Sequence, residues 1–428
     1  MDDPVQKRFT ELFGPEFGHG KPFDLNTLRN ALEALGSPHL NLPPVIHVAG
    51  TNGKGSTIAF MSAIVEAADL KVHAFTKPHL LQINERFVVS SRFADDLTLF
   101  AIAEDVARVG TQLTQFDAQV ATAFQLFHEY HASLALVETG MGGRDDSTNV
   151  IEGPAASVIT PIGLDHQDAL GATLAEIASH KTGILKSAAP AIVARQAPEA
   201  MAVIEARAEE IGAPLFRCGV EWDAYASHGR LVVQTETRAL DLPLPSLQGQ
   251  HQIDNAGLAC AALLFSNAVQ LEDAAFAAGV ANAQWPGRLQ PLTRGAFSAL
   301  VRDLGGEVWV DGGHNAHAAH ALARALTQMK ARRGGVNIAI VGLRKRKDAH
   351  SFITAIAAGA DHIITVPLAE DHTSLDEMAA LGDQLGRDVA TAASLREAMQ
   401  NAAQLPAPRL LICGSFLLAA EALAAENA

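Results

Sequence analysis

The sequence predicts an α/β protein: a doubly wound, mostly parallel sheet domain followed by a smaller Rossmann-like α/β domain. Three observations predict this fold. Short apolar runs rich in β-branched residues alternate with longer, Ala-rich helical stretches. A Gly-rich loop joins the first apolar run to a helical stretch, as in parallel sheets with crossover helices. The segment QWPG at residues 284–287 interrupts the alternation, which then resumes.

The apolar runs are the candidate strands. In the first domain they lie at 45–49, 134–138, 156–160 and 191–194, and in the second at 308–311, 337–341, 362–366 and 410–413. Residues 217–247 alternate in part and contain two prolines, which predicts a small antiparallel excursion, and residues 250–270 predict a helix. Because Pro-Gly breaks any helix, we place the domains at 1–286 and 287–428.

Composition limits the function classes. The chain has 428 residues and a formal net charge of −15, which argues against a protein whose main task is to grip nucleic-acid phosphates. No apolar run approaches the length of a membrane span, and the acidic N-terminus lacks the order of a signal peptide. Three distant cysteines fit reduced core thiols. We therefore expect a cytoplasmic protein with no nucleic-acid and no membrane partner.

The clearest chemical signal follows the first predicted strand. Residues 50–56 read GTNGKGS and lead into a helix that begins near Gly55. Glycines let backbone N–H groups surround phosphate oxygens, the helix N-terminus adds a positive dipole end, and Lys54 supplies a charge for the β- and γ-phosphates. The spacing is shorter than in the usual GxxxxGK[ST] loop. The segment predicts a P-loop that binds a nucleoside triphosphate.

This loop closely resembles that of the Mur ligase superfamily, and within it the folylpolyglutamate synthase and dihydrofolate synthase branch. Further segments resemble motifs of that branch in the family order, so that the resemblance extends over about residues 22–416. These segments are 76–80, 84–86, 138–149, 160–166, 181–184, 254–256, 286–288, 311–315, 347–348 and 413–415. The resemblance implies an ATP-dependent ligase that works with Mg²⁺.

The resemblance implies two Mg²⁺ sites. Glu138 ends a predicted buried strand beside the loop, where a carboxylate meets a nucleotide-bound metal, and the family uses this position as a ligand. His166 is similar to the family's second ligand, and Lys181 is similar to a lysine that family members carry as a carbamate. His180 stands where the family usually has Glu before this lysine. Lys54, Lys181 and His314 are the implied catalytic residues.

Substrate-binding positions also follow from the resemblance. For ATP they are Asn52, Gly53, Lys54, Gly55, Ser56, Asn255, Arg288 and Asp311. For the pterin-bearing substrate they are Pro22, Phe23, Asp24, Leu25, Thr114, Gln115, Phe116, Asp117, Asp145, Asp146 and Ser147. His314 and Ser415 resemble groups placed near the incoming glutamate.

One position departs from the family in a way that matters for chemistry. Lys77 stands where the family has a serine that ligates the first Mg²⁺, and an ammonium group cannot replace that ligand because it has no acceptor. Either Thr76 or water fills the position, or Lys77 reaches toward the γ-phosphate as a second cation. The run RKRK at 344–347 is a second departure, and we hypothesise that it attracts the carboxylates of glutamate or of a polyglutamate tail.

The predicted reaction is ATP-dependent addition of L-glutamate to 7,8-dihydropteroate and to reduced folates through an acyl phosphate, by a monomeric bifunctional enzyme. Three alternatives stay open: an enzyme with only one of these activities, a Mur-type ligase acting on UDP-linked muropeptides, and a nucleotide-gated binding protein without turnover. The muropeptide ligase is disfavoured, because only about 44 residues precede the loop and a separate UDP-binding domain needs many more.

Overall fold

A computed structural model describes residues 3–15, 25–110 and 112–427. The chain divides into two compact units. The first unit contains Met1–Ser246 and Gln252–Gln284, and the second contains Leu247–His251 and Trp285–Ala428. The second unit thus takes seven residues from before the boundary predicted between 286 and 287, namely Leu247–His251, Trp285 and Pro286.

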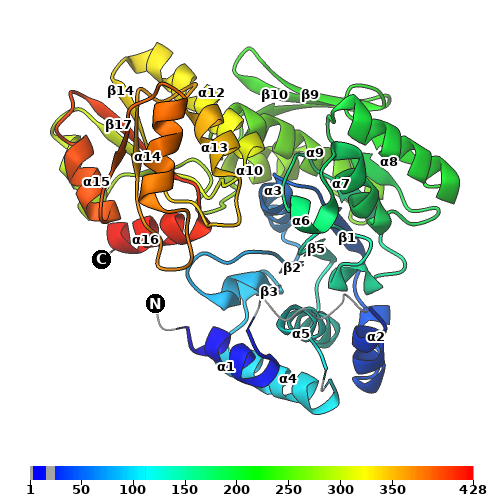
Figure 1. The fold of residues 1–428 in the computed structure, drawn as a ribbon. Helices are drawn as coiled ribbons and strands as arrows, with labels where there is room; N and C mark the ends of the chain where they lie inside the picture. Colours follow the sequence, from blue (N-terminus) through cyan, green and yellow to red (C-terminus); the bar gives the residue numbers. More distant parts are fainter. Residues whose placement is uncertain (1–2, 16–24, 111, 428) are drawn as a thin grey trace. The chain divides into compact units, whose positions relative to one another are not determined.

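The first unit is built on a mostly parallel sheet with the strand order β4-β3-β2-β5-β1-β6-β7-β8 (Figure 1). Its centre, β5-β1-β6, is parallel and fully buried, because helices cover both faces. β3 and β4 add an antiparallel edge. The strands are β1 (Val45–Ala49), β2 (Val72–Phe75), β3 (Phe87–Val89), β4 (Arg92–Phe93), β5 (Leu134–Glu138), β6 (Ala156–Ile159), β7 (Ala191–Val193) and β8 (Leu215–Arg217).

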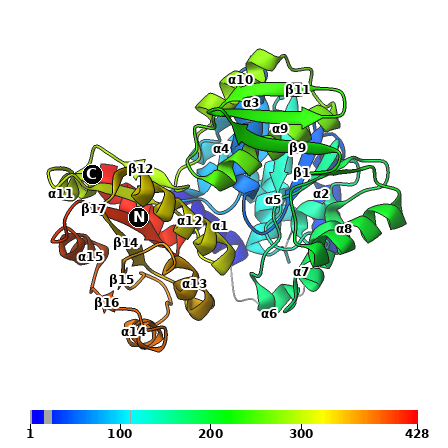
Figure 2. The same cartoon turned by 90° about the horizontal axis from the view of Figure 1, so that it is seen from above.

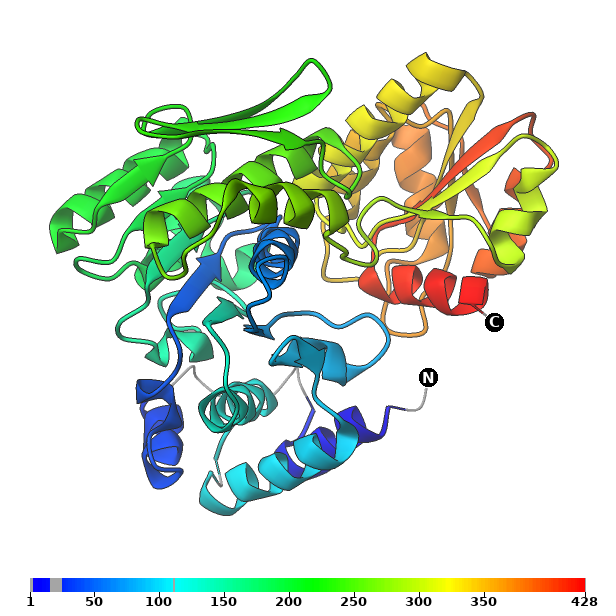
Figure 3. The ribbon, with the colours of Figure 1, turned by 180° about the vertical axis from the view of Figure 1, so that it is seen from behind.

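Helices on one face of this sheet close two apolar clusters. The blue and cyan helices α1 and α4 lie side by side, next to α5 (Figure 3). Their apolar residues surround Phe75 and Val137, whereas α7 and α8 cover Ile159 and Val193. These helices are α1 (Pro4–Phe13), α2 (Leu25–Ala34), α4 (Asp96–Val109), α5 (Gln115–Glu129), α6 (Gln167–Leu170), α7 (Leu174–Lys181) and α8 (Pro198–Ile211), with 3₁₀ turns at Pro38–Leu40, Ile83–Arg86, Ser147–Val150 and Thr182–Ile184.

The remaining helices of the first unit join the sheet to a small antiparallel sheet. α10 (Asp273–Asn282) packs on α3 (Lys54–Glu66) and on β11 (Figure 2). A Cβ on Gly257 of α9 (Gln250–Ser266) would lie 2.2 Å from the Cβ of Ala224, so this helix packs closely on β9. The small sheet consists of β9 (Trp222–Ser227), β10 (Arg230–Thr235) and β11 (Ala239–Pro243), in the order β11-β10-β9.

The second unit has a sheet of order β12-β13-β17-β14-β15-β16, in which only the β12–β13 pairing is antiparallel. α12 and α13 pack together over Val341 and Leu411, and α11 packs on α16. The strands are β12 (Gln290–Leu292), β13 (Glu307–Val310), β14 (Val336–Val341), β15 (His362–Thr365), β16 (Val389–Thr391) and β17 (Pro408–Cys413). The helices are α11 (Ala296–Arg302), α12 (Ala316–Arg333), α13 (Ala349–Ile356), α14 (Leu375–Gln384), α15 (Leu395–Ala402) and α16 (Phe416–Asn427).

The predicted fold class is confirmed, and each predicted strand is present within two residues of its expected ends. The antiparallel excursion is also present, although Arg217 belongs to β8 of the main sheet. The predicted helix 250–270 ends at Ser266. In the described part of the chain, no helix is both long enough and apolar enough to cross a membrane.

Candidate functional site

The loop between β1 and α3 has the shape of an anion site. Gly50 and Gly53 have φ angles of 146° and 93°, which favour glycine. A Cβ on Gly50 would lie 1.8 Å from the hydroxyl of Thr160, and one on Gly53 would lie 2.5 Å from Oδ1 of Asn255. Gly53 is also the N-cap of α3 and offers no capping side chain, so the first N–H groups of the helix are directed at whatever occupies the loop.

The side chain of Lys54 bends back over this loop. Its ammonium donates to the carbonyls of Gly50 and Thr51 at 3.1 and 3.2 Å and lies 3.7 Å from Oε1 of Glu138. Glu138 is the last residue of β5, which pairs directly with β1, so sheet register fixes this carboxylate beside the loop. Its other oxygen accepts the backbone N–H of Lys77 at 3.1 Å. The loop therefore has a cation and a buried carboxylate at its mouth.

Lys181 reaches the same loop from the last turn of α7. Its amine donates to the Gly50 carbonyl at 2.8 Å, and the residue is buried. Burial lowers the pKa of this ammonium from its ordinary 10.5 to about 7, and the nearby charge of Lys54 lowers it too. The carboxylates of Asp165 and Asp146 oppose this shift. A lysine with such a pKa is largely neutral, and therefore nucleophilic, near pH 7.5.

The predicted metal-binding residues include side-chain types that bind divalent cations. Glu138 offers buried carboxylate oxygens, the ligand type that Mg²⁺ prefers. His166 is the N-cap residue of α6 and has a left-handed conformation, and its N–H donates to Asp165 at 2.9 Å. The hydroxyl of buried Thr76 points at the carbonyl of Glu85, 3.4 Å away. No three His, Cys, Asp or Glu side chains among the described residues gather closely enough to hold a metal ion.

Sequence reasoning missed several side chains that fix the loop. Gln252 accepts the side-chain amide of Asn255 at 3.0 Å and lies 3.4 Å from the hydroxyl of Ser56. It stands three residues before Asn255, one turn earlier on a predicted helix, and this spacing was a usable signal. Thr51 and Gly163 exchange hydrogen bonds of 3.0 and 3.1 Å. That contact spans more than a hundred residues, and no local pattern predicts it.

Some of the positions expected to bind the pterin lie close together in the first unit. Asp117 accepts the hydroxyl of Ser147 and that of Thr114, both at 2.6 Å. Asp146 is buried and accepts the N–H of Met141 and the N–H and hydroxyl of Thr148.

The remaining pterin positions are dispersed. The amide of Gln115 donates to Thr10 and Gly14, so its side chain faces α1. Asp145 is exposed and lies 3.7 Å from His180. Leu25 begins α2, whereas Pro22, Phe23 and Asp24 lie outside the described residues.

The remaining predicted residues belong to the second unit. Asp311 follows β13, and its carboxylate accepts the N–H groups of Leu289 and Gly313 at 2.8 and 2.6 Å. The Phe416 ring packs against the Arg288 guanidinium, 4.7 Å from its centroid, and against His314. Ser415 is buried and caps α16 by accepting the N–H of Leu417. The ligand roles of these residues stay predictions.

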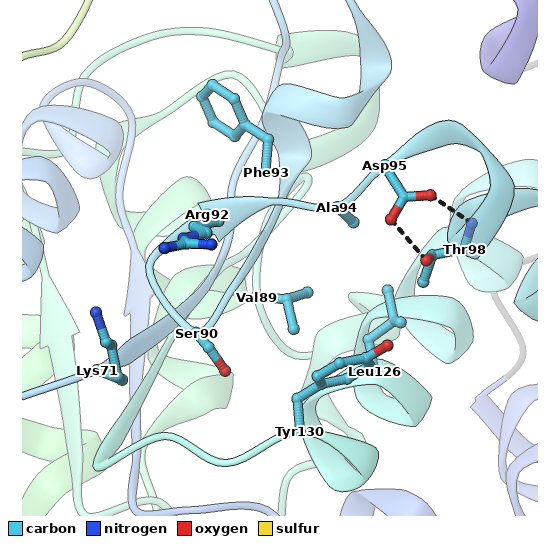
Figure 4. A pocket seen from close by; sticks show the side chains of 10 residues that line it. All are labelled: Lys71, Val89, Ser90, Arg92, Phe93, Ala94, Asp95, Thr98, Leu126 and Tyr130. Carbon is cyan, nitrogen blue, oxygen red and sulfur yellow. Dashed lines mark hydrogen bonds between the residues drawn. The ribbon is translucent and has the colours of Figure 1, made fainter.

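A surface pocket of about 400 Å³ lies near the amino end of β2, whereas Thr76 and Lys77 follow its carboxyl end. Figure 4 shows Arg92 and Ala94 on one side of it and Leu126 and Tyr130 on the other, with Asp95 turned to its bonded partner Thr98. Its lining is Lys71, Val89, Ser90, Arg92, Phe93, Ala94, Asp95, Thr98, Leu126 and Tyr130. None of the described site residues lines it.

Two models of protein families match long stretches of the chain. The Mur ligase middle domain matches residues 48–263, and the Mur ligase, glutamate ligase domain matches residues 298–416. The dihydrofolate synthase/folylpolyglutamate synthase of Bacillus subtilis (strain 168) is 36% identical over 322 residues, which cover 71% of this chain and 72% of that protein.

Two solved structures are similar over nearly the whole chain. One is E. coli FolC in complex with DHPP and ADP, with a TM-score of 0.87, 30% identity, and coverage of 99% of this chain and 97% of that one. The other is the bifunctional folylpolyglutamate synthase/dihydrofolate synthase from Yersinia pestis with AMPPNP and Mn ion, with a TM-score of 0.87, 29% identity, and coverage of 100% and 98%.

A phosphate loop followed by a lysine, a strand-end carboxylate and a second α/β unit define the chain as a Mur ligase. Within that superfamily it belongs to the dihydrofolate synthase/folylpolyglutamate synthase family.

Proposed function

We propose that the chain is an ATP-dependent ligase that adds L-glutamate to 7,8-dihydropteroate, forming dihydrofolate, and to reduced folates. The observation that carries the proposal is that Lys54 and Lys181 both donate to the Gly50 carbonyl, while Glu138 lies 3.7 Å from Lys54. These groups surround a loop shaped for phosphate, in a chain whose relatives carry both activities in their names.

In the proposed reaction a substrate carboxylate attacks the γ-phosphorus of ATP. The new C–O–P linkage is an acyl phosphate, and ADP leaves with the electrons of the broken P–O bond. The amino group of glutamate then attacks the acyl carbon, phosphate leaves, and the nitrogen loses a proton. Lys54 offsets charge on the transferred phosphoryl group, and the backbone N–H groups at the start of α3 hold the phosphates in place.

A divalent metal ion, when bound, neutralises charge on the phosphates and fixes their orientation. We propose that Glu138 and His166 hold Mg²⁺, and that Lys181 contributes as a carbamate. The support for the carbamate is chemical: the neutral amine of Lys181 can attack CO₂, which gives a carbamate and a proton. The side chain changes from neutral to negative beside the positive charge of Lys54, which stabilises the product.

The cluster around Phe116, Asp117, Asp146 and Ser147 is the proposed wall of the pterin pocket. It combines an aromatic face with carboxylates, which suits a heterocycle that carries amino and amide N–H groups. We further propose that the protein is cytoplasmic and has no partner besides its small-molecule substrates. We also propose that it is a monomer, and light scattering of the purified protein would test its oligomeric state.

The test of the function is mass spectrometry of products. Purified protein is incubated with ATP, Mg²⁺, bicarbonate and L-glutamate, separately with dihydropteroate and with tetrahydrofolate. We expect a gain of one glutamyl unit on dihydropteroate and of further units on the folate, and no gain with the Lys54→Met variant. A gain on one acceptor would identify an enzyme with a single activity, and no gain on either would refute the proposal.

A further inference from the structure

Lys77 lies between the phosphate loop and the pterin cluster. It follows β2 and Thr76, and its backbone N–H donates to Oε2 of Glu138 at 3.1 Å. The other oxygen of Glu138 is the one that lies 3.7 Å from Lys54. A single carboxylate therefore separates the main chain of Lys77 from the cation of the phosphate loop.

The side chain of Lys77 is directed to Phe116 of the pterin cluster. Its ammonium lies 4.5 Å from the centroid of the Phe116 ring. That ring packs on Gly140 so closely that a Cβ there would lie 2.5 Å from it, and a carboxylate oxygen of Asp146 would lie 3.2 Å from the same Cβ. The charge of Lys77 counteracts the effect of burial, which raises the pKa of Asp146. The ammonium thus rests on the Phe116 ring, one lysine side chain away from the main-chain contact to Glu138.

The proposed reaction needs a group that holds the carboxylate of the acceptor near the phosphate loop. Dihydropteroate and the folates carry a carboxylate at the end remote from the pterin, and this carboxylate must be held against the γ-phosphate to react. An ammonium group has three donors and a full positive charge. One resting on an aromatic face is already partly ordered before ligand binds. It can then donate to an arriving carboxylate with little further loss of freedom.

We propose that the Lys77 ammonium binds the reacting carboxylate of the folate acceptor and positions it for attack on the terminal phosphate of ATP. This inference rests on the proposed function and assigns a substrate contact to a residue that departs from the family's serine. Lys77 is then a positioning residue of the acceptor, in place of a ligand to the first metal ion.

The competing role is that of a counter-ion for Asp146 alone. The two roles differ in what they predict for ligands. A carboxylate contact discriminates dihydropteroate from its carboxamide analogue, in which the carboxylate is replaced by a neutral group of the same shape. A counter-ion supports the pterin pocket and affects both ligands equally.

The experiment measures binding of these two ligands by calorimetry, in the presence of a non-hydrolysable ATP analogue and Mg²⁺. We expect the wild type to bind dihydropteroate more tightly than the carboxamide. In Lys77→Met the ratio of the two dissociation constants should fall about 10- to 100-fold, as expected for the loss of one charge-assisted hydrogen bond. Lys77→Arg keeps the charge and retains most of the preference. Because Lys77→Met removes a partner of Asp146, thermal unfolding is recorded for every variant, and Lys77→Ser provides a second neutral side chain.

The outcomes separate the two proposals. If Lys77→Met and Lys77→Ser keep the full preference for the carboxylate, or weaken both ligands by the same factor, the inference is overturned while the proposed function stands. If the wild type binds neither ligand and forms no glutamylated product, the proposed function fails and the inference fails with it.

Discussion

Carbamylation of Lys181 is the prediction with the largest expected effect. The perturbation is the pH, at a constant concentration of dissolved ¹³CO₂. A carbamate forms only from the neutral amine, and the pKa of Lys181 is about 7 because the group is buried beside Lys54. We therefore expect the modified fraction to rise as the pH is raised from 6 to 8.

The magnitude follows from the pKa. At pH 8 a group with a pKa of about 7 is roughly nine tenths neutral, whereas an ordinary lysine is about 0.3% neutral. The neutral, reactive fraction of Lys181 at pH 8 is thus roughly 300 times that of a surface lysine. Between pH 6 and pH 8 its neutral fraction rises roughly tenfold.

The assay is ¹³C NMR of the purified protein, in which a carbamate carbon is resolved from free bicarbonate. Lys181→Met is expected to abolish the signal. Lys186→Met is the matched control, because Lys186 is partly buried and has a lowered pKa but lies outside the site. The absence of a carbamate signal at pH 8, or its persistence in Lys181→Met, would refute the reasoning.

Three further predictions follow from the same structure. Gly53→Ala is expected to weaken ATP binding at least about tenfold in a fluorescent-nucleotide titration. The reason is that a left-handed non-glycine residue costs roughly 1–2 kcal/mol and that the new Cβ meets Asn255. Gly212→Ala is the control, because Gly212 also has a positive φ but open space around it, and this variant should bind ATP normally. The pKa of His47 is lowered to about 3 by burial, so below pH 6.5 the unfolded chain binds a proton that the folded chain does not bind. The free energy of unfolding therefore falls as the pH drops from 6.5 toward 3. In an acid titration, His47→Gln should lose less of this free energy over the same range. Arg346→Glu should raise the KM for glutamate several-fold with little change in thermal stability, and an unchanged KM would end the hypothesis of a carboxylate-attracting loop.

Local pattern predicted the central strands but not the edge of the first sheet. β2 has only four residues, VHAF, and a single apolar residue precedes its histidine, whereas an apolar pair lies on either side of His47 in β1. His73 is tolerated because its ring nitrogens lie 3.1 Å from the carbonyl of Tyr130 and from the N–H of Ser90, while burial lowers its pKa to about 4. These partners come from other parts of the chain, so no pattern within β2 could predict them. β3 and β4 are too short for any periodicity to register.

The fold class, the Gly-rich loop with Lys54 and the glutamate at the end of β5 were predictable from local pattern, because each depends on neighbouring residues or on a strand followed by its turn. The order β2-β5-β1-β6, which places Glu138 beside Lys54, and the burial of Lys181, which lowers its pKa, follow from the folded chain alone. The contact of the Lys77 ammonium with Phe116 is likewise a property of the fold. The physical reason is that desolvation, Coulomb interactions and packing depend on distances in space, which close only when segments far apart in the sequence meet.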